Sequence, residues 1–233
     1  MATPPPASQT LSRGIRILEI LAEVDAPLTI DQLASRLEVH RSVAYRLLRT
    51  LEDHRLVTRT PAGSVVLGAK MAALAAGVSR DLQGAALPEL TAVANELAMT
   101  AFLAVRDDAD CVTLVSVEPT RALARVAQRP GVRHRVTAGA PGKAILSQLG
   151  RDELSELADD ELLAAVDAVR AAGYATSHDE VVPTLRSVAV PLALRGRQPA
   201  ALAVVHVVSD ADESVIAARL LLAAQALRRA LDG

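Results

Sequence analysis

Cysteine and aromatic residues are nearly absent from this sequence. Its 233 residues include one cysteine, one phenylalanine, two tyrosines and no tryptophan. The single cysteine, Cys111, excludes an intramolecular disulfide and fits a reducing compartment. Because it falls in the middle of an expected strand without a nearby histidine, it is more typical of a small buried apolar group than of a nucleophile.

Sequence signatures of catalysis and metal binding are missing as well. Paired cysteines, Gly-x-Ser-x-Gly and His-Glu-x-x-His do not occur, which removes the common zinc and hydrolase motifs. The run His178-Asp179-Glu180 could touch a metal, but three adjacent polar residues are more typical of a turn. We therefore assign no catalytic residue, no metal ligand and no cofactor.

Long apolar runs are also lacking. No stretch approaches the ~20 residues that a membrane-spanning helix needs. Residues 1–8 are rich in proline and have neither the basic start nor the apolar centre of a signal peptide, so we expect a disordered tail there. These absences predict a cytoplasmic protein with no membrane partner.

An excess of positive charge is absent too. Lysine and arginine total 25 against 27 aspartate and glutamate, which gives a net charge of −2 and no overall attraction to nucleic acid. Residues 1–68 carry eight arginines and seven acidic residues, so any basic character there must be local. A hydrophobic content of 51% with 22% charged residues describes a globular chain, long enough for two modest domains or one large one.

Two short amphipathic helices and a hairpin are expected between residues 28 and 68. Thr29 followed by Gln32 forms a capping box, which begins a helix that ends at a turn over 38–40. The next helix, over 41–53, has an apolar face with helical spacing: Ala44, Leu47, Leu48 and Leu51. Short strands over 56–59 and 64–67 flank a turn with Pro61 and Gly63. With a helix over 12–24 across the back of the pair, this pattern predicts a winged helix-turn-helix.

The opposite face of the helix over 41–53 has the residue types that a major-groove helix needs. It carries three arginines and no acid, alongside Ser42 and Tyr45. Arginine can bond a guanine edge or a phosphate, and serine and tyrosine can reach phosphates or bases. The alternative is a solvated arginine face on an ordinary helical bundle.

The second half of the chain mixes helices and strands without regular alternation. An alanine-rich helix over 69–80 leads to a boundary near 81–84. Helices are then expected over 85–97, 142–149, 160–172 and 212–231, and strands over 101–106, 111–118, 122–128, 188–194 and 200–208. This pattern predicts an α+β fold in which helices flank an antiparallel sheet.

At this point the sequence resembles a known family, the IclR-type transcriptional regulators. The resemblance is carried by QTLSRGIRILE at 9–19, HRSVAYRLLRTLE at 40–52, PGKA at 141–144 and GYA at 173–175. It implies a winged helix-turn-helix DNA-binding domain over 9–68, a linking helix over 69–83 and a GAF-like effector-binding domain over 84–233. We assign DNA contact to nine residues: Arg13, Thr29, His40, Arg41, Ser42, Tyr45, Arg46, Arg49 and Arg59.

The loop before the helix at 142 is the expected ligand site. It fails the phosphate-loop pattern, since Thr137 stands where that pattern has glycine and Ala144 where it has serine or threonine. Free N–H groups at such a helix start still suit a carboxylate, although a tight turn into the helix explains the glycines equally well. The resemblance implies a pocket lined by this loop and by a set of further positions. The expected effector-binding residues are Gly139, Ala140, Pro141, Gly142, Ser177, Leu185, Ser187, Ala203 and Val205.

This sequence departs from the family at four of those positions. Ser177 and Ser187 stand where the family has Asp and Cys, and Ala203 and Val205 replace a Ser-x-Ser. Our hypothesis is a small organic acid less polar than the small oxo acids, with its anionic group held at the Gly142 helix end. The family comparison also makes the stretch 149–173 look short.

A basic run between residues 121 and 135 allows three interpretations. It contains no acidic residue: Arg121, Arg125, Arg129, Arg133, His134 and Arg135. Most such runs are solvated faces, and the remaining alternatives are a subunit contact or a funnel for an anionic effector.

The expected function is a ligand-responsive transcriptional repressor. It would bind an inverted-repeat operator on double-stranded DNA as a homodimer or a dimer of dimers. Two alternatives remain open at this point. One is a winged-helix module for protein assembly without a DNA target, and the other is a small-molecule enzyme with an accessory helical domain.

Overall fold

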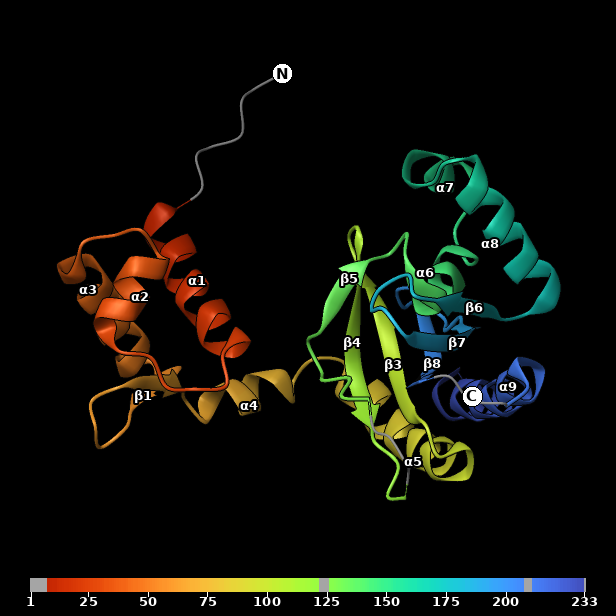
Figure 1. Ribbon diagram of the computed structural model, residues 1–233, viewed down its shortest axis with the longest axis horizontal. Coiled ribbons are helices and arrows are strands. Elements are labelled where there is room, and N and C mark those ends of the chain that lie inside the picture. The colour runs from red at the N-terminus through yellow and green to blue at the C-terminus, as the bar shows by residue number, and fades with distance from the viewer. Residues whose placement is uncertain (1–7, 122–125, 208–210, 233) are drawn as a thin grey trace. The chain divides into compact units, whose positions relative to one another are not determined.

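The computed structural model describes residues 8–121, 126–207 and 211–232. It divides into two compact units, Met1–Ser79 and Arg80–Gly233, each with its own elements (Figure 1). Each unit is described by itself.

The N-terminal unit is a winged helix-turn-helix, as predicted. It contains helices α1 (Gln9–Glu23), α2 (Ile30–Arg36) and α3 (Arg41–Asp53), followed by antiparallel strands β1 (Val57–Arg59) and β2 (Val65–Leu67). The predicted capping box begins α2, because Thr29 Oγ1 accepts from Gln32 N at 3.3 Å while Gln32 Oε1 accepts from Thr29 N at 2.8 Å.

One small core holds this unit together. Ile17 of α1, Leu33 of α2 and Leu48 of α3 are fully buried against one another's helices. An isolated bridge between Leu28 and Val65 ties the turn before α2 to the wing. Backbone hydrogen bonds therefore join the hairpin to the helices that its side chains also pack against.

The expected continuous helix over 69–80 is interrupted. Helix α4 (Lys70–Ala75) is followed by turns, and α5 (Arg80–Leu97) begins anew. Ser79 has a φ of 45°, a left-handed conformation that a continuous α-helix does not allow. None of the residues of α4 is buried, so little side-chain packing stabilises this short helix.

An antiparallel sheet organises the C-terminal unit, which confirms the predicted α+β class. Its strand order is β5-β4-β3-β8-β7-β6, and every neighbouring pair is antiparallel. The strands are β3 (Thr100–Asp107), β4 (Asp110–Val117), β5 (Arg133–Arg135), β6 (Ala175–His178), β7 (Leu185–Leu192) and β8 (Ala200–Val207).

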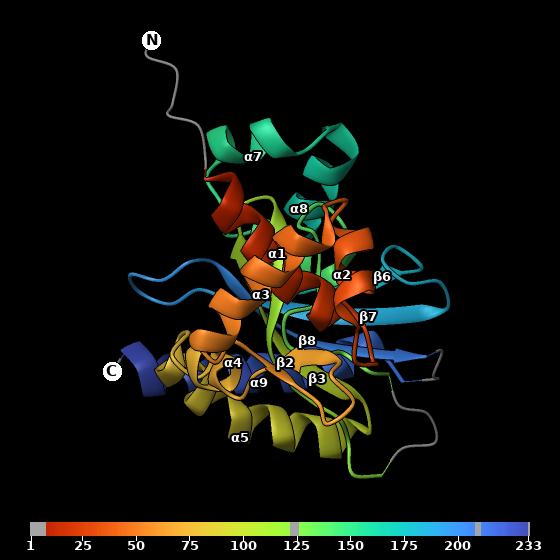
Figure 2. The same ribbon diagram turned by 90° about the vertical axis from the view of Figure 1, so that its left-hand side faces the viewer.

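Helices cover both faces of this sheet (Figures 1 and 2). Helices α5 and α9 (Glu213–Asp232) pack on one face. Helix α6 (Gly139–Leu146) packs on the other, with α7 (Arg151–Leu157) and α8 (Asp160–Ala172) outside it. Successive strand residues point to opposite sides, so Leu202 enters the first core and Ala203 the second.

Two sequence expectations need correction here. Of the strand expected over 122–128, residues 122–125 lie outside the described part, and 126–128 are not in a strand. The sheet continues instead through β5, which pairs with β4. Helix α6 begins at Gly139 and not at 142, because proline at position 141 lies in the first turn, where no N–H is needed.

Part of the basic run lies in β5, where acidic residues of the β3–β4 hairpin neutralise it. Arg133 bonds Asp107 at 2.6 Å, and Arg135 lies 3.6 Å from Asp110. Strand β6 and helix α7, which were not predicted, complete the unit. The capping glycine predicted at 173 is confirmed, with a φ of 81°.

We expect Leu48→Ala to lower the free energy of unfolding of the N-terminal unit by ~2–5 kcal/mol, because Leu48 is fully buried and its removal leaves a cavity. Urea denaturation followed by circular dichroism measures this. Leu11→Ala is the matched control, since Leu11 is 63% exposed. Equal effects of the two substitutions would contradict the core described above.

Candidate DNA interface and ligand cavity

Helix α3 presents two faces with different compositions. Ala44, Leu47, Leu48 and Leu51 are buried, whereas the polar side chains of the other face are exposed. The exposed set is Arg41, Ser42, Tyr45, Arg46 and Arg49. Tyr45 is 50% exposed, a large aromatic surface for a position outside the core. The residues predicted to face DNA therefore lie together on the outer side of one helix.

The arginines of this face differ in whether the protein itself holds them. Within the described residues, the guanidinium groups of Arg46 and Arg49 form no hydrogen bond or ion pair. Arg41 donates to Asp31 at 2.6 Å and so connects the start of α3 to α2. Arg46 and Arg49 are thus free to bond an external anion or a base edge.

Arg59 of the wing is held by α3. Its Nε lies 2.5 Å from Glu52 Oε1, and about a third of its side chain remains exposed (32%). The ion pair fixes the wing beside α3 and neutralises one positive charge of the predicted interface. Arg59 accordingly positions the hairpin, and its direct contact with DNA stays a prediction.

Three other residues assigned to DNA are placed at helix ends or partly buried. Thr29 caps α2 through the box described above. His40 caps α3, with its Nδ1 3.3 Å from the N–H of Ser42 and 2.8 Å from the hydroxyl of Ser42. Arg13 is half-buried on α1. The structure gives Thr29 and His40 a capping role, which sets the direction of the two helices.

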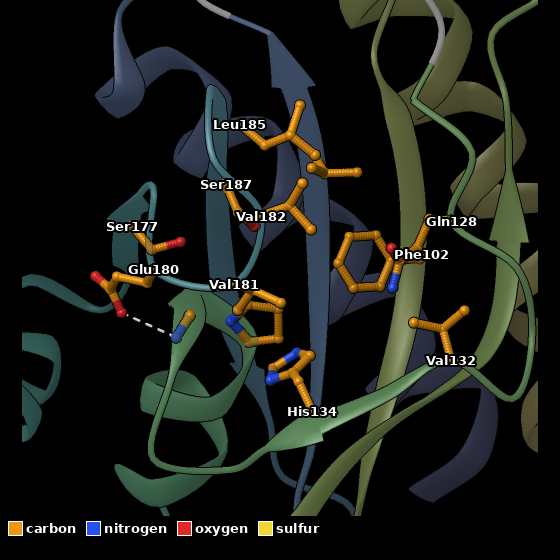
Figure 3. A pocket seen from close by; sticks show the side chains of 13 residues that line it. Phe102, Gln128, Val132, His134, Ser177, Glu180, Val181, Val182, Leu185 and Ser187 are labelled. Atoms are coloured by element: carbon orange, nitrogen blue, oxygen red, sulfur yellow. Dashed lines mark hydrogen bonds between the residues drawn. The ribbon is translucent and has the colours of Figure 1, made fainter.

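A cavity of about 90 Å³ opens on the α6 side of the sheet (Figure 3). Its walls come from strands β3, β5, β6, β7 and β8, the start of α6, the segment before β5, and the connection between β6 and β7. They are mostly apolar, with a few polar side chains. The lining residues are Phe102, Gln128, Val132, His134, Gly139, Pro141, Ser177, Glu180, Val181, Val182, Leu185, Ser187 and Val205.

The structure brings most of the expected effector-binding residues to this cavity. Gly139, Pro141, Ser177, Leu185, Ser187 and Val205 line it. Strand pairing explains part of the grouping, because Ser187 lies opposite both Ser177 and Val205 in the sheet. Residues far apart in sequence thus share one row across three strands.

Three of the expected effector-binding residues do not line the cavity, which corrects the sequence prediction: Ala140, Gly142 and Ala203. Ala140 and Ala203 are fully buried in the core between α6 and the sheet. Gly142 is inside α6, where a Cβ would lie 2.2 Å from the Val136 carbonyl oxygen. Close packing therefore requires glycine at position 142. The anion-binding site expected at the start of the helix is not at Gly142, because the helix begins at Gly139.

Several lining residues were not predicted from the sequence. Phe102 could have been found from strand alternation, since it faces the same side as Ala104. Val181 and Val182 carry no pattern that separates them from other loop valines. His134 belongs to the basic run and Glu180 to the polar turn, and only the fold shows that both face the cavity (Figure 3).

The polar side chains of the wall are partly committed to the protein. Ser187 donates to the Val204 carbonyl at 2.8 Å, and Gln128 Nε2 donates to Thr113 Oγ1 at 2.7 Å. His134 Nδ1 lies 3.0 Å from the Arg135 carbonyl, which can only accept. In the neutral ring this contact leaves Nε2 as the acceptor.

Glu180 is anchored by two donors beside the cavity. Its Oε2 accepts from the Gly139 N–H at 2.9 Å, the bond drawn in Figure 3, and its Oε1 accepts from Lys143 Nζ at 2.6 Å. Lys143 also donates to the Thr176 carbonyl at 3.3 Å. A carboxylate of the protein therefore sits at the first N–H of α6, where negative charge is favoured.

The single cysteine is buried, and its surroundings determine its reactivity. Burial raises the pKa of the Cys111 thiol to about 12, so it stays protonated and unreactive at neutral pH. Within residues 8–121, 126–207 and 211–232, no three metal-ligating side chains converge. In the same residues, no helix has the length and apolarity to cross a membrane.

Two family models match the chain, one to each half. Residues 10–61 match the IclR helix-turn-helix domain. Residues 74–231 match the C-terminal domain of the bacterial transcriptional regulator IclR. The second match alone covers more than half of the chain.

Known proteins resemble the chain along the same lines. The HTH-type transcriptional regulator XynR of Escherichia coli is 29% identical, over 97% of this chain and 98% of that protein. The acetate operon repressor of Salmonella typhimurium is 29% identical, over 64% of this chain and 56% of its own length. An IclR homologue from Microbacterium hydrocarbonoxydans, crystallised with 4-hydroxybenzoate, has a TM-score of 0.83 and 24% identity, covering 96% of this chain and 99% of that one.

We expect Gly142→Ala to destabilise the C-terminal unit by ~1–3 kcal/mol, since the added methyl group meets the rigid backbone at residue 136. Gly84→Ala is the control. No atom lies within 4 Å of its added Cβ, and its place in α5 predicts a gain of ~0.5–1 kcal/mol. Chemical denaturation of both variants measures the two effects, and effects of the same sign would contradict the packing argument.

Proposed function

This chain belongs to the IclR family of bacterial transcriptional regulators, and we propose on that premise that it is a ligand-responsive repressor that binds its operator as a dimer. As a member of this family it is a DNA-binding regulator and not an enzyme. Its place of action is then the cytoplasm, where the DNA is.

The observation that carries the DNA-binding role is the free guanidinium pair on α3. Arg46 and Arg49 are exposed and unpaired among the described residues, while Arg41 and Arg59 hold α3 to α2 and to the wing. The paired arginines hold the helix in place, and the unpaired arginines are exposed and able to bind. Both properties suit a helix that enters the major groove. Ser42 and Tyr45 on the same face would add contacts to phosphates or bases.

Charge supports a dimer over a monomer. Residues 1–68 have a net charge of only +1, from eight arginines and seven acidic residues. One such surface releases few counterions, so two copies are needed for firm binding. A two-fold dimer requires an inverted repeat with half-sites ~34 Å apart or a multiple of that distance. The same reasoning allows a dimer of dimers.

The cavity supports a small-molecule effector. Its mostly apolar wall and few polar groups suit an aromatic or alkyl body with one polar end. The related fold that holds 4-hydroxybenzoate agrees with an effector of this kind. We expect repression, because occupancy of a promoter is sufficient for it, and effector binding would need to shift the DNA-binding equilibrium by only ~1–3 kcal/mol.

We expect Arg46→Ala to cost ~1–3 kcal/mol of specific binding, because it removes a free donor from the exposed face of α3. Fluorescence anisotropy on an operator selected from genomic fragments measures the loss. Arg16→Ala is the control, since Arg16 is exposed on α1 but bonds Glu19 at 3.0 Å. Unchanged affinity of the Arg46 variant would remove its role in reading bases.

Salt dependence separates this function from a protein-assembly module. We expect the affinity for operator DNA to fall steeply and linearly on a log–log plot as salt rises, because bound arginines release counterions. The slope should be about twice that of an isolated N-terminal unit if the active form is a dimer. A protein without DNA affinity at low salt would favour the assembly module.

A further inference from the structure

The connection between β6 and β7, residues 179–184, covers part of the cavity, and we call it the flap. Val181 and Val182 line the cavity while remaining 45% and 49% exposed. Because about half of each valine side chain is in water, burial of these side chains stabilises the position of the segment only in part. Within the described residues, the flap's one link to α6 by hydrogen bond or ion pair is the Glu180 side chain.

Both ends of the flap have backbone conformations that favour a change of direction. Asp179 and Thr184 have φ angles of 62° and 70°. A hydrogen bond from Asp179 N to the Leu185 carbonyl, at 3.1 Å, closes the base of the loop. The flap is therefore a closed loop on a defined base, and it can move as one piece about that base.

Glu180 also separates two open spaces. It lines the cavity together with Gly139 and Ser177. It lines an outer groove as well, together with Lys143 and residues of α8 such as Glu161. The bonds from Glu180 to Gly139 and Lys143 thus lie between the cavity and the groove.

We propose that Glu180 is a gate residue whose carboxylate holds the flap shut, and that the effector's own carboxylate replaces it on Gly139 N–H and Lys143 Nζ. This inference rests on the proposed function and names how the same cavity selects its ligand. The exchange is chemically balanced, because the effector's carboxylate accepts hydrogen bonds from the same two donors that the Glu180 carboxylate leaves. The released flap then carries Glu180 into solvent.

The gate sets the class of effector. A neutral ligand that displaces Glu180 can accept hydrogen bonds from Gly139 and Lys143, but it leaves the charge of Lys143 without an anion. A dicarboxylate brings a second charge against an apolar wall that includes Phe102 and Val132. A monocarboxylate with an apolar body meets both requirements, because its charged group would bind Gly139 N–H and Lys143 Nζ and its apolar part would fill the cavity.

Hydrogen exchange with mass spectrometry on the full chain tests the gate. We expect Glu180→Ala to raise exchange at least tenfold in the peptides that cover residues 137–146 and 179–185, and Glu180→Gln to give a smaller rise. Glu161→Ala is the matched control, because it removes an acid from the same groove without touching Gly139. Acetate, butyrate and benzoate are the probes, each paired with its neutral amide.

At least one acid should restore protection in Glu180→Ala at a concentration tenfold or more below that needed for the wild type, while its amide should not. Two results would overturn the proposal. One is exchange in Glu180→Ala equal to that in Glu161→Ala. The other is equal action, or no action, of every acid and its amide on Glu180→Ala.

DNA binding of the same proteins keeps the two proposals apart. Failure of the wild type to bind DNA in a salt-dependent way removes the proposed function whatever the exchange shows. Normal DNA binding by all variants, together with an overturning exchange result, removes only the gate.

Discussion

The burial of one face of α3 is the constraint on which the N-terminal unit depends. Leu47, Leu48 and Leu51 are held against α1 and the wing, so the helix cannot rotate without exposing them. At 100° per residue, that constraint also decides which side chains face outward. The same leucines that stabilise the unit therefore turn Arg46 and Arg49 outward, so that stability and the proposed DNA contact share one helix.

Small residues play the corresponding role in the C-terminal unit. Alanines at 189, 201 and 203 on one sheet face meet glycine and alanine positions of α6, which brings helix and sheet close together. Gly142 packs as closely on the segment before the helix, because an added Cβ would lie 2.2 Å from the Val136 carbonyl oxygen. The cavity lies next to this contact, where Phe102 and the flap join the first turn of α6 as lining. Dense packing on one side thus gives the cavity a rigid floor.

Paired charges explain how a nearly neutral chain can have the two anion-binding places that we propose. Several arginines close to these places bond an acid of the protein, as Arg59 does with Glu52 and Arg133 with Asp107. Such pairs fix geometry and add little long-range field. The positive charge left to bind another molecule is local. It consists of the two free arginines on α3 and of Lys143, which already binds a carboxylate.

Patterns within single elements were readable from the sequence, because capping boxes and helical or alternating apolar spacing depend on neighbours along the chain. They yielded α2, α3, the wing, most strands and the loop before α6. The tertiary structure alone decided the rest. The ion pair of Arg133 with Asp107 and the contact of Glu180 with α6 join residues far apart in sequence. The close approach of Gly142 to Val136 joins residues near one another in the sequence, but it depends on how the chain turns into α6. The Glu180 contact arises only when the sheet brings β6, β7 and α6 together, since bonding distances are set by packing and not by spacing along the chain.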